Sequence, residues 1–557
     1  MFAGKSAAPN DQNETVSRSA ATAASNAPVA AFAMRTFRPE PAGAKESAGD
    51  RIARPNEPPR PMLTRLLLLA VLLPCAARAE FRAGFAERDI TPAVGMEVPG
   101  GYGKALSKRI HDPCKVRAVV FDDGQREVAL VGLDALFVPR PLVLEVRKLL
   151  QARCGLAPEA VMIGASHSHS SGPLGIVGEY DHASPLIQDL AYKKSTVADA
   201  GYVAKVRDAI VEAVAAAHDA RAVATAGFGT GREDQVAFNR RIRMKHGLAF
   251  SHPGKGNPDN VEFAGPTDPE VGVIGAWDAD GRLLGCVVNF SCHATASGPW
   301  ISANWIYYME RAIQGYFGAE TKVVFLQGAC GDVTQVNNLD PRANPESDAW
   351  SQLVGGRVGA EAVKVLLGLS QTRVAEVPVE ARQKTWNIAR RVPAPERVAA
   401  ALELVQKPEK DGGPDWVWAK ETVLLDALIA KSPTVEVEVQ AIQVGPVVCV
   451  SNPAEYFCAY GLEIKAGSGF PITFPVELAN GCAGYVPTEE AFGEHGGGYE
   501  TRLTSYSNLE ITAGAQFRDT GLALARQMKP APLPERPPAP PFTGAGWLYG
   551  NQPPQLR

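Results

Sequence analysis

From residue 81 to residue 528 the chain alternates short apolar runs with longer stretches in which apolar residues recur at helical spacing. A short apolar run between turn residues is typical of a buried strand, whereas a period of 3.6 residues is typical of a helix that covers a sheet. Strands are predicted at 128–133, 161–165, 284–291 and 322–327, and helices at 142–150, 202–217 and 349–367. The pattern predicts an α/β fold over residues 80–528, as a large single domain of layered mixed β-sheets flanked by helices.

Three later stretches add detail to this picture. Residues 392–428 are predicted to be helical with a turn at 407–413, and to form an excursion over the body of the domain. Residues 434–439 alternate between polar and apolar, and Gly-Pro at 445–446 separates them from the apolar run 447–450, which predicts a β-hairpin. The glycine-rich segment 493–498 is a candidate lid or binding loop, with a plain surface turn as the alternative.

Both ends of the chain are predicted to lie outside this domain. Residues 62–79 have a basic start, an apolar run at 66–73 and Ala-Arg-Ala at 77–79, which is the pattern of a secretory signal peptide. We therefore expect export to the periplasm or the cell exterior. Residues 1–61 are rich in Ala, Pro, Ser and Arg and are predicted to be a disordered extension, or to precede a true start at Met62. Residues 529–557 are predicted to be a proline-rich tail.

Charge and cysteine content narrow the classes of partner. The formal net charge is −4 at pH 7, whereas nucleic-acid-binding domains are usually clearly basic, so DNA and RNA are excluded as partners. The run 66–73 is far shorter than the roughly 20 residues of a spanning helix, so no transmembrane span is expected and peripheral membrane contact stays open. Removal of Cys75 with the signal would leave eight cysteines, which fit either disulfides or buried thiols.

Three histidines follow predicted strands. His167 and His169 come directly after the strand at 161–165, and on an extended backbone residues two apart point to the same face, so both imidazoles could approach one ion. His293 follows the strand at 284–291, at the kind of strand end where α/β proteins gather active-site groups. This spacing indicates a metal site.

Other polar residues near strand ends could complete such a site. Glu455 follows an apolar strand and Tyr485 follows a glycine-rich turn, although each could equally be a helix-start carboxylate or a packed aromatic. The segment 328–334 contains Asp332, which could orient a metal-bound histidine, and Thr334, which offers a hydroxyl. No serine-hydrolase elbow, Walker loop or dinucleotide fingerprint is present in the sequence.

Taken in order, these motifs resemble the neutral/alkaline non-lysosomal ceramidase family, specifically its catalytic domain. The resemblance runs from Ala83, in a segment that ends with Asp-Ile-Thr-Pro at 89–92, to about residue 528. Its further markers are Ser-His-Ser-His-Ser-Ser-Gly at 166–172, Phe-Asn-Arg at 238–240, Asn-Phe-Ser-Cys-His at 289–293, Gly-Asp-Val-Thr at 331–334, Pro-Ala-Glu at 453–455, Tyr-Val-Pro-Thr-Glu-Glu at 485–490 and Tyr-Glu-Thr at 499–501.

The resemblance implies a zinc-dependent hydrolase that acts on linear amides, such as the N-acyl bond of ceramide or a related lipid-like N-acyl amine. It implies that Zn²⁺ is held by four ligands, namely His167, His293, Glu455 and Tyr485. His169 matches the group that handles the proton of the leaving amine, and Arg240 and Tyr499 match polar groups that line the reacting centre. Such an ion polarises the carbonyl and lowers the pKa of its water to about 7.

Two departures from the family pattern keep other functions open. Thr334 stands where the family has an essential serine, and the proline-rich tail stands where members commonly carry an immunoglobulin-like domain. One alternative is a secreted metal- or lipid-binding relative without catalysis, and another is a hydrolase of a different amide or ester. A third is an amidohydrolase-type barrel, in which a His-x-His pair belongs to the first strand.

Overall fold

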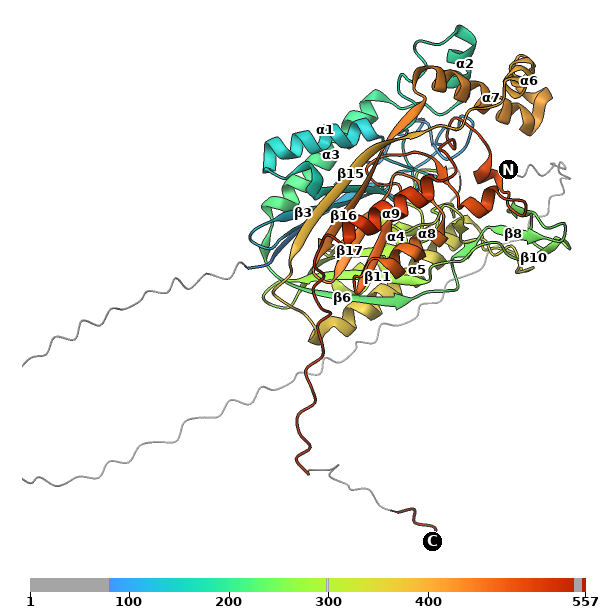
Figure 1. Ribbon diagram of the computed structural model, residues 1–557. Coiled ribbons are helices and arrows are strands. Elements are labelled where there is room, and N and C mark those ends of the chain that lie inside the picture. Colours follow the sequence, from blue (N-terminus) through green and yellow to red (C-terminus); the bar gives the residue numbers. More distant parts are fainter. Residues whose placement is uncertain (1–79, 297, 299, 545–552) are drawn as a thin grey trace, which may run out of the picture. The chain divides into compact units, whose positions relative to one another are not determined.

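The computed structural model describes residues 80–296, 298, 300–544 and 553–557 (Figure 1). The predicted signal peptide at 62–79 and the extension at 1–61 lie outside the described residues. Three β-sheets of four or five strands form the framework, and their strands come from consecutive thirds of the domain.

The three main sheets are mixed. The first has the strand order β4-β3-β2-β1-β5 and consists of β1 (Arg82–Asp89), β2 (Lys115–Asp122), β3 (Glu127–Leu133), β4 (Val161–Ala165) and β5 (Ala222–Val223). The second has the order β13-β12-β11-β6 and consists of β6 (Thr225–Arg232), β11 (Glu270–Trp277), β12 (Leu283–Phe290) and β13 (Lys322–Gln327). The third has the order β15-β16-β17-β19 and consists of β15 (Val379–Ala389), β16 (Thr434–Val444), β17 (Val447–Ser451) and β19 (Ile472–Val476).

A pair of helices covers the outer face of each sheet (Figure 1). The first sheet carries α1 (Arg140–Cys154) and α3 (Ala200–Asp219). The second carries α4 (Trp305–Phe317) and α5 (Ser347–Gly368). The third carries α8 (Cys458–Gly467) and α9 (Ala513–Ala525).

The inner faces of the three sheets share one central core, so their strands are buried on both sides. In β2, Ala118 and Val120 pack toward α1 and α3, whereas Val119 and Phe121 pack into the central core. Side chains of a strand alternate between its two faces, so double-sided burial requires an unbroken apolar run. This is why β4, β13 and β17 read as apolar runs, whereas the partly exposed start of β16 alternates between polar and apolar residues.

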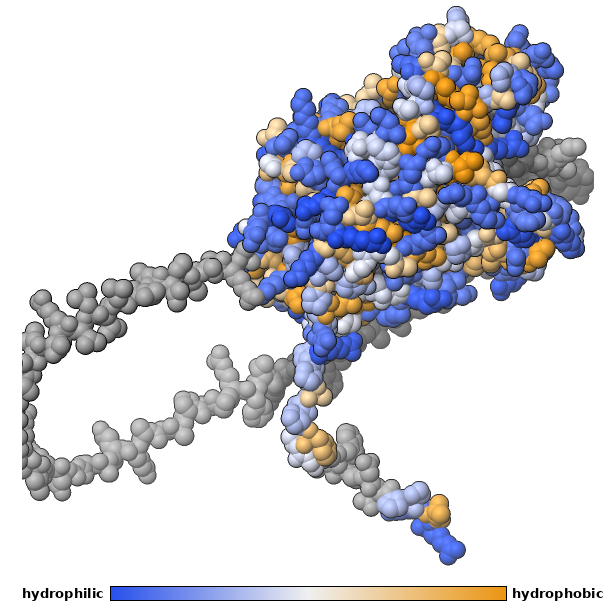
Figure 2. All heavy atoms as spheres, in the orientation of Figure 1, coloured by the Kyte–Doolittle hydropathy of each residue, from blue (hydrophilic) through white to orange (hydrophobic). Residues whose placement is uncertain are grey.

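A smaller helical group lies at one end of the body. It is made of α2 (Pro185–Lys194), α6 (Pro395–Val405) and α7 (Glu409–Lys431), which share an apolar cluster of their own (Figure 1). Helices α6 and α7 lie within an insertion, residues 390–433, between the paired strand ends Ala389 and Thr434. Figure 2 shows hydrophobic residues at the surface around this group, whereas much of the remaining visible surface is hydrophilic.

Short strands complete the structure near the ends of the main sheets. They are β7 (Phe238–Asn239), which pairs with β14 (Val333–Thr334); β8 (Arg241–Met244), which pairs with β9 (Ala249–Ser251) and β10 (Asn260–Phe263); and β18 (Glu455–Tyr456), which pairs with β20 (Tyr485–Val486). Single turns of 3₁₀ helix occur at Pro158–Ala160, Leu369–Gln371, Glu489–Phe492 and Tyr499–Thr501.

The predicted α/β class is confirmed, and the predicted strands and helices correspond to β3, β4, β12, β13, α1, α3 and α5. The hairpin is confirmed as β16 and β17, with Val444 paired to Val447. The turn expected at 407–413 is wrong in extent, because α7 already begins at Glu409 and departs from helical geometry only at Gly413, just before Pro414. The barrel alternative is wrong, because the described strands form separate sheets.

Three further expectations can be compared with the described residues. None of the helices in this part of the chain combines the length and the apolar character that a bilayer crossing needs. All eight described cysteines are free thiols. Residues 529–544 of the predicted tail form neither a helix nor a strand.

The central core predicts the cost of removing one of its aromatic residues. Phe474 in β19 is fully buried and its ring packs against the backbone of Gly272. We expect Phe474→Ala to lower the free energy of unfolding by about 3–5 kcal/mol, because it leaves a cavity where three sheets meet. Urea unfolding measures this loss, with Val392→Ala, 69% exposed, as a control that changes stability by less than about 0.5 kcal/mol. Equal effects of the two substitutions would contradict the central-core assignment.

Candidate active site

The candidate site lies where strands of different sheets end. His167 comes two residues after β4, and His293 comes three residues after β12. Ser168 and Ala294 form an isolated parallel β-bridge, and the backbone N–H of His169 donates to the carbonyl of Ala294. This bridge brings the two histidine segments, which are far apart in sequence, side by side.

The backbone at His167 differs from the sequence-based expectation. His167 has a φ angle of 60°, in the left-handed region, so the expectation of an extended His-x-His segment is wrong. The two rings nevertheless meet, because the Nε2 atoms of His167 and His169 are 3.1 Å apart. A left-handed conformation at a residue with a side chain is strained, and strain of this kind is found mostly at functional sites.

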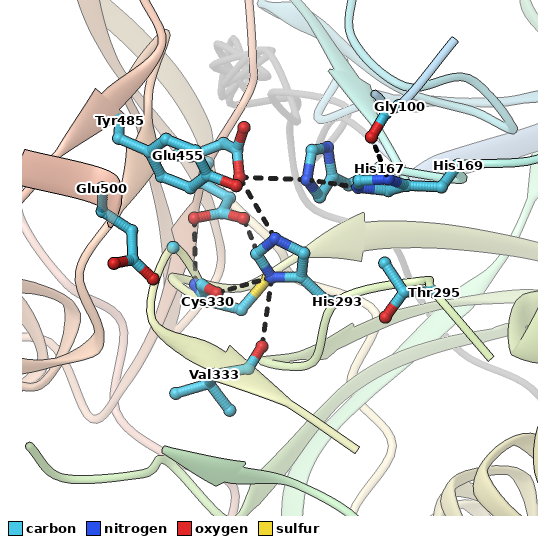
Figure 3. Close-up of polar contacts among 12 residues, drawn as sticks. Gly100, His167, His169, His293, Thr295, Cys330, Val333, Glu455, Tyr485 and Glu500 are labelled. Atoms are coloured by element: carbon cyan, nitrogen blue, oxygen red, sulfur yellow. Dashed lines mark hydrogen bonds and ion pairs between the residues drawn. The ribbon is translucent and has the colours of Figure 1, made fainter. Parts of the chain in front are cut away.

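Backbone carbonyls fix the tautomer of each histidine (Figure 3). The Nδ1 atom of His167 donates to the carbonyl of Leu136 at 2.9 Å, and that of His293 donates to the carbonyl of Cys330 at 2.8 Å. The Nδ1 atom of His169 donates to the carbonyl of Gly100 at 3.0 Å. Because a carbonyl only accepts, each Nδ1 carries the proton and each Nε2 presents a lone pair to the site.

Two of these lone pairs converge on one carboxylate oxygen. Glu455 Oε2 is 3.1 Å from the Nε2 atom of His167 and 3.1 Å from that of His293. Glu455 Oε1 accepts a hydrogen bond of 2.8 Å from the hydroxyl of Tyr506. An oxygen and two nitrogens that all present lone pairs to one another repel unless a cation lies between them.

The spacing of these atoms fits a small divalent cation. Tetrahedral ligands at roughly 2.0–2.1 Å from a metal lie about 3.3–3.4 Å from one another. The measured contacts of 3.1 Å between Glu455 Oε2 and the two Nε2 atoms are close to this value. His167, His169 and His293 also form a group whose ligating atoms all lie within 4.8 Å of one another. The residues present therefore fit a metal ion, with His169 as a possible further ligand by distance alone.

The electrostatics of the site favour an ionised Glu455 and a neutral His293, but they favour a proton on His167. Burial, together with the positive charge of Arg240, lowers the pKa of His293 to about 3. Burial opposes ionisation of Glu455, but the neighbouring His167 and the hydrogen bonds of both histidines outweigh it and hold the pKa of Glu455 well below its ordinary value. Burial also opposes a charge on His167, but Glu455 raises the pKa of His167. The carboxylate thus stays ionised and favours a positive charge beside it.

Aromatic rings and an arginine form one wall of the site. Tyr485, paired with Glu455 through β18 and β20, has its hydroxyl 3.2 Å from that of Tyr499. The Arg240 guanidinium lies 5.3 Å and 4.9 Å from the centroids of these two rings, and its Nη1 is 3.1 Å from His293 Nε2. Glu500 accepts from Arg240 Nε at 2.7 Å and so holds the guanidinium in place.

Thr334, another proposed catalytic residue, follows Val333, whose carbonyl lies 3.1 Å from His293 Nδ1. Thr334 lies buried in β14, and its hydroxyl accepts from the N–H of Val336 at 3.1 Å. The neighbouring Asp332 does not contact a histidine; its carboxylate accepts from Asn239 Nδ2 and from the N–H of Cys458. Both residues therefore stabilise the segment that follows β13.

A cavity of about 340 Å³ opens beside the histidines. Its lining includes His167, His169, Glu455, Tyr485 and Tyr499, but not His293, Arg240 or Thr334. Apolar residues on its wall are Pro99, Leu136, Phe137 and Ile176, and polar ones are Tyr102, Ser195, Thr196, Glu421, Ser505 and Tyr506. The insertion contributes to this wall through Glu421 of α7.

The glycine-rich segment 493–498 does not line the cavity. Its Gly496 carbonyl accepts from the N–H of Ala249, and its Gly497 carbonyl accepts from Arg241 Nε, so it is bound to the β8–β9 hairpin. The segment leads directly into Tyr499 and Glu500 and thereby places them. Sequence reasoning missed Glu500, although it lies inside the Tyr-Glu-Thr motif, and missed Tyr506, for which the sequence carries no signal.

The metal content of purified variants distinguishes residues that bind the metal from residues that only lie near it. We expect His293→Ala to lose the bound metal, because Glu455 Oε2 then faces a single imidazole. We expect His169→Ala to keep it, because His167, His293 and Glu455 remain. Elemental analysis of the purified, folded variants measures this difference. Stoichiometric metal in His293→Ala would contradict the ligand assignment, and loss of metal in His169→Ala would make His169 a ligand.

The chain was compared with known proteins. No protein-family model matches it. A neutral ceramidase of Pseudomonas aeruginosa is 27% identical over 334 residues, which are 55% of this chain and 46% of that relative. The chain thus matches about half the length of this relative.

Solved structures show the same fold. The crystal structure of neutral ceramidase from Pseudomonas aeruginosa matches with a TM-score of 0.60 and 20% identity over 82% of this chain and 76% of that chain. A structure of ceramidase complexed with C2 matches with a TM-score of 0.60 and 20% identity over 84% of this chain and 78% of that chain. In sequence and in fold, the chain is therefore similar to neutral ceramidases.

Proposed function

We propose that this chain is a zinc-dependent amidase that hydrolyses the N-acyl amide bond of ceramide or a related N-acyl lipid to a fatty acid and an amine. The observation that carries the proposal is the convergence of His167 Nε2 and His293 Nε2 on Glu455 Oε2, beside a cavity that His167 and Glu455 line. Two imidazoles and a carboxylate are a donor set typical of catalytic zinc. The similarity to neutral ceramidases supports the substrate class.

In this proposal His167, His293 and Glu455 hold the ion, with Tyr485 beside Glu455 as the fourth ligand. When bound, zinc supplies the Lewis acidity that polarises the amide carbonyl and activates a water. The Nδ1 hydrogen bonds to Leu136 and Cys330 keep both rings in the ligating tautomer and orientation.

His169 is placed to move protons. Its Nδ1–H is held by the carbonyl of Gly100, so its Nε2, which lies 3.1 Å from His167 Nε2, carries the lone pair that can accept a proton. In the proposed reaction His169 Nε2 takes a proton from the attacking water and returns it to the amide nitrogen. An amine is a poor leaving group without that proton, so the transfer is needed for the C–N bond to break.

Tyr499 and Arg240 stabilise the charge that develops on the carbonyl oxygen. The Tyr499 hydroxyl reaches the cavity and can donate a hydrogen bond to that oxygen. Arg240 lies behind Tyr485 and Tyr499 and adds a fixed positive charge, oriented by Glu500. We therefore assign Arg240 an electrostatic role exerted through the tyrosines rather than direct contact with the substrate.

The cavity suits an amide with apolar neighbours. Leu136, Phe137 and Ile176 offer apolar contacts to an acyl or alkyl chain. A volume of about 340 Å³ lies at the small end of ligand cavities, so it accommodates the reacting amide and adjoining carbons while a long chain extends outward. We also propose export of the protein, on the basis of the signal-like pattern at 62–79.

Hydrolysis of a panel of N-acyl amines tests the function. We expect the zinc-loaded chain to release fatty acid from the panel, which includes a short-chain and a long-chain ceramide. Removal of the metal by a chelator should abolish release, and added zinc should restore it. Folded His169→Ala, with zinc bound, should lose at least about 100-fold in kcat, as expected for loss of a general acid-base group. Stoichiometric zinc with no turnover on any amide would contradict the amidase and favour a metal- or lipid-binding relative.

Thr334 provides a second test of the family comparison. We expect Thr334→Ser to retain or raise amidase activity, because serine keeps the hydroxyl that accepts from Val336 and removes only a methyl group. Thr334→Val is the matched control, since it keeps the shape and removes the hydroxyl. A large fall in kcat/KM for Thr334→Ser would mean that the threonine methyl group is adapted to a different substrate.

A further inference from the structure

Glu477 is a buried carboxylate that the proposed reaction does not use. It follows directly after β19, has an exposed fraction of 0%, and its backbone N–H donates to the carbonyl of Gln327 at the end of β13. Glu477 therefore lies where the ends of the second and third sheets meet, behind the cluster formed by His167, His293 and Glu455.

One side of Glu477 fixes the acceptor of His293. Its Oε2 accepts from the backbone N–H of Cys330 at 2.9 Å, and its Oε1 accepts from the Cys330 thiol at 2.9 Å. The carbonyl of the same residue, Cys330, accepts the Nδ1 hydrogen bond of His293 at 2.8 Å. Glu477 thus holds the residue whose carbonyl sets the orientation of the His293 ring.

The other side of Glu477 fixes the segment that carries Glu455. Oε2 of Glu477 also accepts from the backbone N–H of Tyr456 at 2.8 Å. That N–H belongs to the peptide group that joins Glu455 to Tyr456, so its position sets where the Glu455 side chain begins. Glu477 Oε2 therefore links the backbone next to Glu455 with the backbone of Cys330, whose carbonyl orients His293.

A purely structural role does not account well for a carboxylate at this place. The three groups that donate to Glu477 are two backbone N–H groups and a thiol, and none is a lysine or arginine of the described residues. Burial of a carboxylate without a cationic partner is costly, and an apolar side chain would fill the space at lower cost. The same hydrogen bonds already engage both oxygens, so Glu477 is not placed to be a ligand itself.

We propose that Glu477 is a positioning residue of the metal site, which sets metal affinity by holding the Cys330 and Tyr456 peptides in register. This inference rests on the metal site of the proposed function. It concerns the geometry of the donor atoms and is independent of which amide the protein cleaves. Hydrogen bonds one step removed from a metal typically change its affinity by 10- to 100-fold when removed.

Metal titration of the full chain tests the proposal. The metal is removed by a chelator and replaced by Co²⁺, whose visible spectrum reports the ligand geometry, and the dissociation constant is measured by competition with a chelator. We expect Glu477→Leu to raise the dissociation constant by about 10- to 100-fold and to change the Co²⁺ spectrum. Glu477→Gln should stay within about threefold of the wild type, because its amide oxygen can accept from both N–H groups.

Glu438→Gln is the matched control. Glu438 is a buried carboxylate in β16 that binds Arg140 and Arg147, away from the histidines. This variant should lower the melting temperature and leave the dissociation constant unchanged. If Glu477→Leu does not show the near-ultraviolet circular dichroism of the wild type, Glu477→Asp replaces it. The shorter side chain cannot reach both N–H groups and should weaken binding by about tenfold.

Wild-type affinity in folded Glu477→Leu or Glu477→Asp would overturn the proposal. An equal loss of affinity in Glu438→Gln would overturn it too, because the effect would then reflect general destabilisation. A wild-type chain that binds neither Zn²⁺ nor Co²⁺ would instead remove the metal site, and with it the proposed function on which this inference depends.

Discussion

The fold holds lone pairs of two histidines and a carboxylate close together, and the repulsion among these lone pairs is the constraint on which the site depends. Backbone carbonyls of Leu136 and Cys330 occupy the Nδ1 protons of two histidines, so both Nε2 lone pairs face Glu455 Oε2 at 3.1 Å. Arg240 Nη1 donates to His293 Nε2, but the contact between His167 Nε2 and Glu455 Oε2 is favourable only when a positive charge joins it, either a proton on His167 or a metal ion. The surrounding backbone therefore has to be rigid enough to keep the three atoms together before the cation arrives.

That rigidity comes from the three sheets. His167, His293 and Glu455 come shortly after the ends of β4, β12 and β17, and these strands are buried on both faces by the central core and by a helix pair. A bridge between Ser168 and Ala294 joins the first and second sheets, and the Glu477 N–H bond to Gln327 joins the second and third. Folding of the domain already orders the donor atoms. Binding of a cation therefore does not have to supply the free energy of ordering them.

Much of this arrangement was predictable from the sequence, and the reasons for the exceptions are physical. Strand β4 is an unbroken apolar run bounded by turn residues, so its limits and the histidines behind it could be predicted. Strand β15 was not predicted, because it is an edge strand with a largely polar, partly exposed sequence, Val-Glu-Ala-Arg-Gln-Lys-Thr-Trp-Asn-Ile-Ala. The left-handed backbone at His167 and the carbonyls that bind Nδ1 depend on tertiary contacts, which no local pattern encodes.

The cavity wall has two parts: residues that take part in the proposed chemistry and residues that shape the substrate pocket. The histidines, Glu455 and the tyrosines are held by the sheets, whereas Glu421 belongs to the insertion at 390–433, which has its own apolar cluster with α2. Lys420, next to it, is buried and donates to the carbonyl of Lys194 and to the hydroxyl of Ser195, so α7 also fixes a second part of the wall. The insertion is also bonded to the reacting centre, because Arg391 donates to the carbonyls of Thr501 and Ser507, in the segment that carries Tyr499 and Tyr506. Tyr506 in turn donates to Glu455, so the insertion both shapes the pocket and supports the backbone next to the donor atoms.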